Sequence, residues 1–469
     1  MKPRNITPEN TEFVFLSFEG PDIYSLAGGL GVRIDHLCRT LADIGFTTHL
    51  FFIGDPSLPG EEVTRDGKLI LHRWCQWLSK YYPKGVYDGE APKLGDFTGS
   101  IPGFIKDHVV KPAVARGKMV AILGEEWQTA EAMCRLSDAL YHDGVRDRAI
   151  MFWNANNTYY FELVNWARLN FTTTLTTVSR YMKHLMGRMG LNPLVIPNGI
   201  PKELLQKVDD NLVRLVRQVF DPDMVLCKVA RWHPDKRWSE AIKAVAMLKE
   251  HGSRPVLLAI GGMEGYGLGV LDEARAMGLV IKEAAAKADS FDARLSALAE
   301  AMPADIIVIK SHLTLDFLAV VYRAADAVLA NSGHEPFGIV GLEAMAAGGI
   351  AFTGNTGEDY AIPFVNAIMV ETADPQEIVG YLMYLHNHPE ECARMRNVAR
   401  MTARYFTWST AVQILLSKLE NQAEIQGLLD PFSTSAPRMT PAYDMASDIF
   451  RHPLSESIEL EELLCGKGT

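Results

Sequence analysis

Two acidic residues, Glu335 and Glu343, stand in one short stretch of the chain, with seven residues between them. This stretch follows the apolar run 327–330, which has the composition of a buried strand, and helical composition begins near Gly338. A helix that starts at the carboxyl end of a strand, with glycine at its N-terminus, offers free backbone amides to a phosphate. We therefore expect two carboxylates beside a phosphate-bearing ligand.

Two cations, Arg231 and Lys236, lie in a polar turn that follows another apolar run, Met224–Ala230. Ligands of open α/β sheets bind at the carboxyl ends of the strands, which is where this turn would lie. An Arg fork and a Lys point charge together suit a diphosphate. The segment Asp221–Asp223 has the Asp-x-Asp shape of a metal motif, but it precedes the run, so we expect a turn there and no metal.

Alternating strands and helices must position these residues. The first series has an apolar run over 13–18, the glycine loop Gly28–Gly31, a helix that ends at Gly45 and a strand over 46–53. A second series of the same kind begins midway along the chain with Met224–Ala230. Each series is a βαβ unit, which implies a parallel sheet covered by helices. The sequence therefore predicts an α/β fold of two Rossmann-like, doubly wound domains.

The expected domain boundaries follow from the turn-rich segment 191–201, which holds three prolines and an Asn-Gly pair. We expect an N-terminal domain over 1–205 and a C-terminal domain over 206–403. A helix within 404–428 has apolar residues at helical spacing and is expected to pack back on the N-terminal domain. The Ser/Pro/Met-rich tail 430–469 has too little apolar surface to pack well and is expected to be loosely attached.

Composition limits the classes of function. The chain has 469 residues and a formal charge of −11, with 48% hydrophobic and 22% charged residues, a globular balance that disfavours a broad nucleic-acid footprint. The six cysteines include no Cys-x-x-Cys pair, so neither a zinc site nor a disulfide framework is indicated. No apolar run is long enough to span a bilayer and the N-terminus has no signal-peptide pattern, so we expect a cytoplasmic protein. A peripheral membrane contact stays open.

Four stretches, in this order, resemble the retaining glycosyltransferases of family 4, which have the GT-B architecture of two Rossmann-like domains facing across a cleft. They are Gly28–Gly31, Val178–Met182 leading to Pro197–Ile200, Ala230–Arg231 with Lys236, and the pair Glu335 and Glu343. Each stretch alone is a weak signal, whereas the four together are specific.

The resemblance implies a role for each of these residues. Arg231 and Lys236 would stabilise the diphosphate of a nucleotide-sugar donor as it leaves, so that no metal and no other cofactor would be needed. Glu335 would contact hydroxyls of the transferred sugar, and Glu343 would contact the ribose. A further group would bind the donor through backbone or loop atoms, and it comprises Gly28, Gly29, Gly262, Phe337, Gly338, Ile339, Val340, Thr356 and Gly357.

The sequence also departs from the family. Many relatives have a histidine near the sugar where this chain has Phe152–Asn157, and we expect Asn154 to supply a polar contact there. The glycine loop is similar, more weakly, to the N-terminal domain of bacterial glycogen and starch synthases, but Ala27 replaces their Lys, and they usually lack Glu343. The pair Glu125–Glu126 lies where relatives show an acidic pattern and is a candidate for the acceptor side.

The expected activity is retaining transfer of a hexose, with glucose favoured, from a nucleoside-diphosphate sugar to a carbohydrate or other hydroxyl acceptor. Three alternatives stay open, namely a nucleotide-sugar epimerase of the same fold, a glucan-elongating enzyme similar to glycogen and starch synthases, and a binding protein with a degenerate site. The acceptor, the base of the donor (UDP, ADP or GDP) and the oligomeric state are not determined by the sequence.

Overall fold

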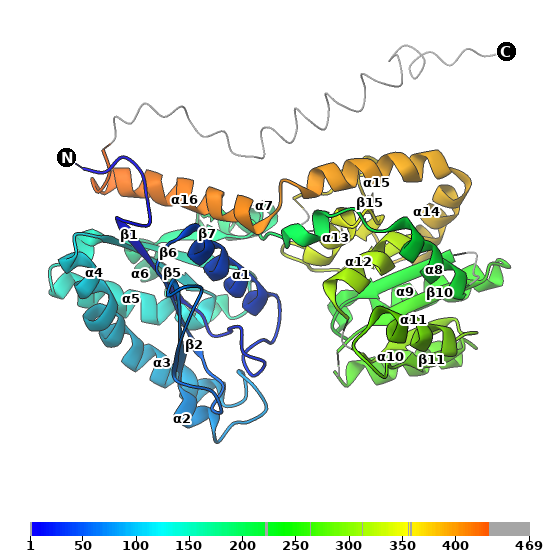
Figure 1. The fold of residues 1–469 in the computed structure, drawn as a ribbon, viewed down its shortest axis with the longest axis horizontal. Coiled ribbons are helices and arrows are strands. Elements are labelled where there is room, and N and C mark those ends of the chain that lie inside the picture. Colours follow the sequence, from blue (N-terminus) through cyan, green and yellow to red (C-terminus); the bar gives the residue numbers. More distant parts are fainter. Residues whose placement is uncertain are drawn as a thin grey trace, which may run out of the picture. The chain divides into compact units, whose positions relative to one another are not determined.

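The computed structural model describes residues 2–220, 224–262, 264–311, 313–354, 356 and 359–430. Within this part the chain forms two compact units (Figure 1). Unit 1 contains the chain up to Gly199 and again from Trp408, and unit 2 contains Ile200–Thr407. The chain enters unit 2 a few residues before the expected boundary at 205/206. Except for Asp430, the expected tail 430–469 lies outside the described residues.

Unit 1 is built on an eight-stranded sheet in the order β3-β4-β2-β1-β5-β6-β7-β8. The strands are β1 (Thr11–Leu16), β2 (Thr48–Ile53), β3 (Glu61–Thr64), β4 (Leu69–Trp74), β5 (Met119–Glu125), β6 (Ala149–Ala155), β7 (Thr174–Thr177) and β8 (Leu194–Val195). All neighbours pair in parallel except β3 with β4. The central strands β1 and β5 are buried along their whole length, as strands covered on both faces must be.

Helices cover both faces of this sheet (Figure 1). They are α1 (Gly29–Ile44), α2 (Gln76–Ser79), α3 (Glu90–Ile105), α4 (Lys111–Ala115), α5 (Trp127–His142), α6 (Trp166–Thr172), α7 (Arg180–Gly187) and α16 (Trp408–Ile425). The C-terminal helix α16 shares the hydrophobic core of α1 and the sheet through Trp408, Val412 and Leu415. The last described helix thus completes the first unit of the chain.

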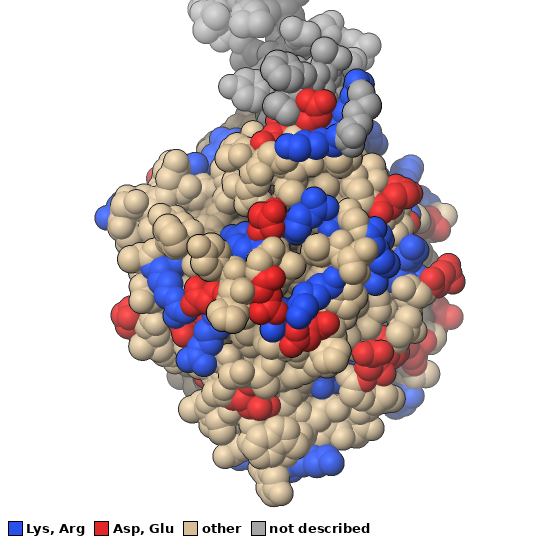
Figure 2. Space-filling model, turned by 90° about the vertical axis from the view of Figure 1, so that its left-hand side faces the viewer, with Lys and Arg blue, Asp and Glu red and all other residues tan. Residues whose placement is uncertain are grey.

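The surface of the chain carries both signs of charge. On the face drawn in Figure 2, Lys and Arg side chains are interspersed with Asp and Glu side chains. Within the described ranges, no helix is both long enough and apolar enough to cross a membrane.

Unit 2 has a seven-stranded sheet in the order β11-β12-β10-β9-β13-β14-β15, in which every pair is parallel. The strands are β9 (Met224–Val229), β10 (Pro255–Ile260), β11 (Ile281–Ala284), β12 (Ile306–Ile309), β13 (Ala327–Ala330), β14 (Ala351–Thr353) and β15 (Ile368–Met369). The helices are α8 (Asp210–Phe220), α9 (Trp238–Glu250), α10 (Tyr266–Ala276), α11 (Phe291–Glu300), α12 (Leu315–Ala324), α13 (Ile339–Ala346), α14 (Pro375–Asn387) and α15 (Pro389–Ala403).

The strand order of unit 2 reverses direction at β9. From β9 the chain moves to β10 and outward on one side, and it later returns to β13 on the other side of β9. In an open α/β sheet, the crevice beyond the carboxyl ends of two such strands is the usual ligand site. The loops that follow β9 and β13 hold Arg231, Lys236 and Glu335, the residues expected to be catalytic.

Candidate active site

Lys236 and Glu335 meet at the carboxyl ends of β9 and β13. Lys236 ends a short 3₁₀ turn, Pro234–Lys236, that leads into α9, and its Nζ lies 2.5 Å from Oε2 of Glu335. Both side chains stay partly exposed, so a ligand can reach the pair. The structure therefore brings together a cation and a carboxylate that stand 99 residues apart in the sequence.

The loops around this pair are tied to one another. The amide of Gly333 donates to the Asp235 carbonyl at 2.7 Å, and the amide of Glu335 donates to Oγ1 of Thr356 at 3.1 Å. A Cβ on Gly333 would lie 3.1 Å from Nε of Arg237, so glycine lets the two loops approach closely. Thr356, expected to bind the donor, thus supports the backbone of Glu335. Gly357, expected to act beside it, lies outside the described residues.

Arg231 is the cation of this loop that stays available. Its side chain is exposed and makes no hydrogen bond or ion pair with another residue in the described ranges. Its carbonyl accepts a hydrogen bond from Nε1 of Trp238 at 2.9 Å, and Trp238 stacks on Trp232 with ring centroids 3.9 Å apart. The loop is therefore held rigidly while the guanidinium is free to meet an anion.

The start of α13 presents backbone amides. Gly338 precedes the helix with φ of 80°, in the left-handed region that favours glycine, and no side chain caps the helix. The first-turn amides, those of Ile339 and Val340 included, therefore carry the positive end of the helix dipole. Phe337 is buried, and its ring packs against Tyr360, whose hydroxyl donates to the Gly338 carbonyl. Phe337 could thus contact a ligand only through its backbone.

Glu343 lies one turn into α13 and is half-buried. Burial raises the pKa of its carboxyl to about 7, and the hydroxyl of Tyr322 donates to it at 3.3 Å. A carboxyl with so few donors around it can accept hydrogen bonds from the hydroxyls of a ligand. Of the two predicted acids, Glu335 is thus paired with a cation and Glu343 is not, within the part of the chain that is described.

Gly262 lies just beyond the carboxyl end of β10, the strand next to β9. A Cβ on the preceding residue, Gly261, would lie 2.1 Å from the Trp232 ring, so this turn must be glycine to pass the indole. Gly262 itself packs against the Glu264 carboxylate, which accepts a hydrogen bond from the amide of Trp232 at 3.1 Å. The turn after β10 thereby braces the loop of Arg231.

A buried lysine lies beneath this site and was not predicted. Lys228 is 1% exposed, and its Nζ donates to the Leu329 carbonyl at 3.1 Å and to Oδ1 of Asn331 at 2.7 Å. Burial lowers the pKa of Lys228 to about 7. The signal in the sequence is a single charge inside the otherwise apolar run Met224–Ala230.

In unit 1 the glycine loop holds a carboxylate of the chain itself. The amides of Gly28 and Gly31 donate to Oε2 of Glu19 at 2.9 and 3.0 Å, and the Tyr87 hydroxyl donates to Oε1 at 2.6 Å. Glu19 is buried at the N-terminus of α1, a place that favours an anion. A phosphate that used the Gly28 amide would have to displace this carboxylate, whereas Gly29 is exposed.

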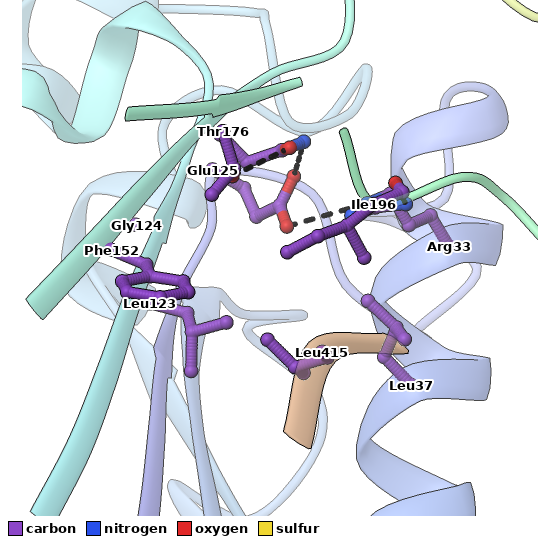
Figure 3. A pocket seen from close by; sticks show the side chains of 10 residues that line it. Arg33, Leu37, Leu123, Gly124, Glu125, Phe152, Thr176, Ile196 and Leu415 are labelled. Carbon is purple, nitrogen blue, oxygen red and sulfur yellow. Dashed lines mark hydrogen bonds and ion pairs between the residues drawn. The ribbon is translucent and has the colours of Figure 1, made fainter. Parts of the chain in front are cut away.

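Figure 3 shows Glu125, Thr176 and Arg33 in a buried polar network of unit 1, and Asn154 belongs to the same network. Its amide nitrogen donates to Glu125 at 2.8 Å, and its oxygen accepts from Thr176 at 2.9 Å. Glu125 is also paired with Arg33, which donates to Oδ1 of Asn198 near the end of unit 1. In this structure the hydrogen-bonding groups of Asn154 are used within the fold, so a sugar contact by Asn154 would require these bonds to break.

Glu126, next to Glu125, has an unusual backbone and an unusual carboxyl. Its φ is 66°, in a region that non-glycine residues rarely adopt, and it accepts hydrogen bonds from the amides of Asn156 and Asn157. Burial raises the pKa of this carboxyl to about 8. Strained backbone and shifted pKa values both gather at functional sites, and Glu126 follows the carboxyl end of β5.

The described ranges contain no group of three or more His, Cys, Asp or Glu residues placed to hold a metal ion. The segment Asp221–Asp223, for which a turn and no metal was expected, lies outside the described residues.

Comparison with known proteins finds a family match for part of the chain. Residues 215–402, which form most of unit 2, match the family described as glycosyl transferases group 1. A D-inositol 3-phosphate glycosyltransferase of Actinosynnema mirum is 31% identical over 163 residues, 33% of this chain and 33% of that protein. A protein of the same name from Streptomyces avermitilis is 27% identical over 415 residues, 82% of this chain and 81% of that protein.

The mannosylfructose-phosphate synthase of Agrobacterium fabrum matches over 27% of its length, so several of these relatives are matched over less than two thirds of their own length. Among solved structures, the sucrose-phosphate synthase of Thermosynechococcus elongatus superposes with a TM-score of 0.64 at 16% identity, over 89% of this chain and 99% of that one. This likeness confirms the predicted fold class, GT-B with two Rossmann-like parallel-sheet domains. In sequence, the chain is thus similar to the group 1 glycosyl transferases over residues 215–402.

Proposed function

We propose that this chain is a retaining glycosyltransferase that moves a hexose, with glucose favoured, from a nucleoside diphosphate to a hydroxyl acceptor without a metal ion. The observation that carries the proposal is the meeting of Lys236 and Glu335 beyond the carboxyl ends of β9 and β13. A second cation, Arg231, follows β9 in the same loop and is exposed. A diphosphate bound there would lie between two cations and the amides at the start of α13.

The leaving group is the part of the reaction that these cations would serve. When the bond between the anomeric carbon and the diphosphate oxygen breaks, its electron pair stays with the diphosphate and the sugar gains oxocarbenium character. Arg231 and Lys236 would stabilise the added negative charge in place of a metal ion. An ammonium has three donors, so Lys236 can keep its bond to Glu335 and still contact a phosphate oxygen.

The two carboxylates would hold the hydroxyls of the donor. Glu335, placed by Lys236 and by the backbone contact to Thr356, would accept hydrogen bonds from the sugar. Glu343 would accept hydrogen bonds from the ribose, and these would return its raised pKa toward the ordinary value. For retention, the acceptor would attack on the face that the diphosphate leaves, and a diphosphate oxygen would take the acceptor proton.

The names of the curated relatives suggest the first acceptor to test. Several of them are D-inositol 3-phosphate glycosyltransferases, so a phosphorylated polyol is the first choice, followed by a hexose 6-phosphate and a maltooligosaccharide.

Release of the nucleoside diphosphate tests the proposal directly. The purified chain would be incubated with UDP-, ADP- and GDP-glucose, with and without each acceptor, and the product linkage would be assigned by NMR. Lys236→Met and Glu335→Gln should abolish most turnover. Lys243→Met is the matched control, because Lys243 is a lysine of α9 that pairs with Glu273. Failure of the wild type to bind or turn over any donor would refute the proposal, and an epimer formed without acceptor would favour an epimerase.

A further inference from the structure

The hydrogen-bond ladder between β9 and β13 is short. It pairs Ala327 with Leu226 and Val328 with Cys227. Beyond that point the Nζ of Lys228 bridges the two strands, because it donates to the Leu329 carbonyl at 3.1 Å and to Oδ1 of Asn331 at 2.7 Å. The side chain of Lys228 thus links β9 to β13 where the backbone hydrogen bonds between them end. This point lies at the base of the loops that carry Lys236 and Glu335.

This lysine joins the two strands at a cost in stability. It is 1% exposed and lies 5.4 Å from the centre of the Trp238 ring, and none of the ion pairs in the described ranges includes it. Its partner Asn331 is fully buried, and Nδ2 of Asn331 has no hydrogen-bond partner among the described residues. A buried cation without a carboxylate costs stability, and an apolar residue would fill an apolar strand without that cost. The position therefore serves something other than the fold.

We propose that Lys228 is a positioning residue of the donor site, which sets the spacing of the β9 and β13 loops and whose charge is compensated by the diphosphate of the donor. This inference rests on the proposed function, since it takes the diphosphate to bind beyond these two strand ends. The donor would supply the negative charge that compensates the ammonium of Lys228. Binding of the donor and protonation of Lys228 would then favour each other.

The charges around Lys228 fit this coupling. Burial is the largest cause that lowers its pKa, to about 7, and Lys236 and Arg237 lower it further, whereas Glu240 and Cys227 raise it. The cations lie in the loop before α9, Glu240 lies in α9 and Cys227 in β9. A diphosphate in that loop raises the pKa, so the complex takes up a proton near neutral pH. If the pKa of Lys228 rises by about one unit, this group takes up about half a proton at pH 7.5. Glu343, with a pKa of about 7, releases about a quarter of a proton when the ribose binds, so the net uptake is about a quarter of a proton for each nucleotide.

Calorimetry can count this proton. UDP, ADP and GDP would be titrated in turn into the full chain at pH 7.5, in two buffers that differ in ionisation enthalpy. We expect proton uptake with wild type, weaker binding without uptake with Lys228→Met, and wild-type behaviour with Lys249→Met. Lys249 is the matched control because it pairs with Asp305 near the end of α9. If Lys228 had only a structural role, its substitution would not remove the proton uptake that accompanies nucleotide binding.

A second variant keeps the test valid if Lys228→Met does not fold. Asn331→Asp would place a carboxylate beside the ammonium and keep Lys228 charged before the nucleotide arrives, so uptake should fall while the loops keep their spacing. Wild-type uptake in both variants would overturn the inference and leave the proposed function intact. Absence of nucleotide binding by wild type would overturn the proposed function, and this inference with it.

Discussion

The carboxyl of Glu126 should make the stability of the protein depend on pH in a way that one substitution removes. Glu126 is 4% exposed, and its pKa is raised from 4.5 to about 8 by burial. Between pH 4.5 and about pH 8, the folded chain therefore binds more protons at this site than the unfolded chain. Stability is lost as the pH rises through this window toward 8, because the folded protein must either keep a proton or bury a charge.

The size of the effect follows from the shift. Each unit of pKa corresponds to about 1.4 kcal/mol, so between pH 6 and pH 8 this carboxyl lowers the free energy of unfolding by about 2 kcal/mol, an order-of-magnitude value. Glu126→Gln resembles the protonated acid in shape, and its oxygen can still accept from the amides of Asn156 and Asn157. The variant should therefore gain about 2 kcal/mol relative to wild type over this range.

Urea unfolding at pH 6 and pH 8, followed by circular dichroism, would measure the difference between wild type and Glu126→Gln. The comparison of two proteins cancels the titration of all other groups. Glu162→Gln changes an exposed carboxylate in the turn Phe161–Leu163. Its free energy of unfolding should change between pH 6 and pH 8 by the same amount as that of wild type. If the same is true of Glu126→Gln, the carboxyl is ionised in the fold and the reasoning is wrong.

Three further changes test other parts of the structure. The stability contributed by Lys228 should rise with pH, because its pKa is lowered from 10.5 to about 7 in the fold. Between pH 7 and pH 9 the free energy of unfolding of wild type should therefore increase by about 2 kcal/mol relative to that of Lys228→Met. Equal unfolding curves of the two proteins at both pH values would contradict this. Lys236→Met should lower kcat by about 10²–10³ through loss of charge on the leaving group, and a change confined to KM would refute that role. Gly29→Ala should leave the unfolding midpoint unchanged, because its Cβ would meet nothing within 4 Å, while a ligand close to the backbone would make turnover fall; unchanged turnover would remove Gly29 from the site.

The elements that position the site could be predicted because they follow local rules. The apolar run 327–330 forms β13, and Gly45 caps α1 in the left-handed conformation. Gly338 likewise precedes α13 with positive φ, as a glycine at a strand-to-helix turn suggests. Each of these signals lies within a few residues of the feature that it predicts.

The partners of the polar residues could not be predicted, because they depend on contacts between distant parts of the chain. Glu125 and Asn154 are hydrogen-bonded across 29 residues, and Lys228 and Asn331 across 103. Asn154 was expected to face the sugar on the strength of a resemblance, but its neighbours in the sequence do not show that Glu125 and Thr176 occupy its amide. Parallel sheets place such partners side by side only after folding.

Three of the residues that break local rules lie at one kind of place. Glu126 follows β5, Lys228 lies at the end of β9, and Glu19 follows β1, each at a carboxyl end of a parallel strand. The strands β1 and β5 are buried along their whole length and are apolar except for Thr11, Glu12 and Glu125. Buried charge and strained backbone lower stability, so they persist where they serve another purpose. Because carboxyl ends are where α/β sheets bind ligands, these three positions are the first to substitute when a ligand role is tested in each unit.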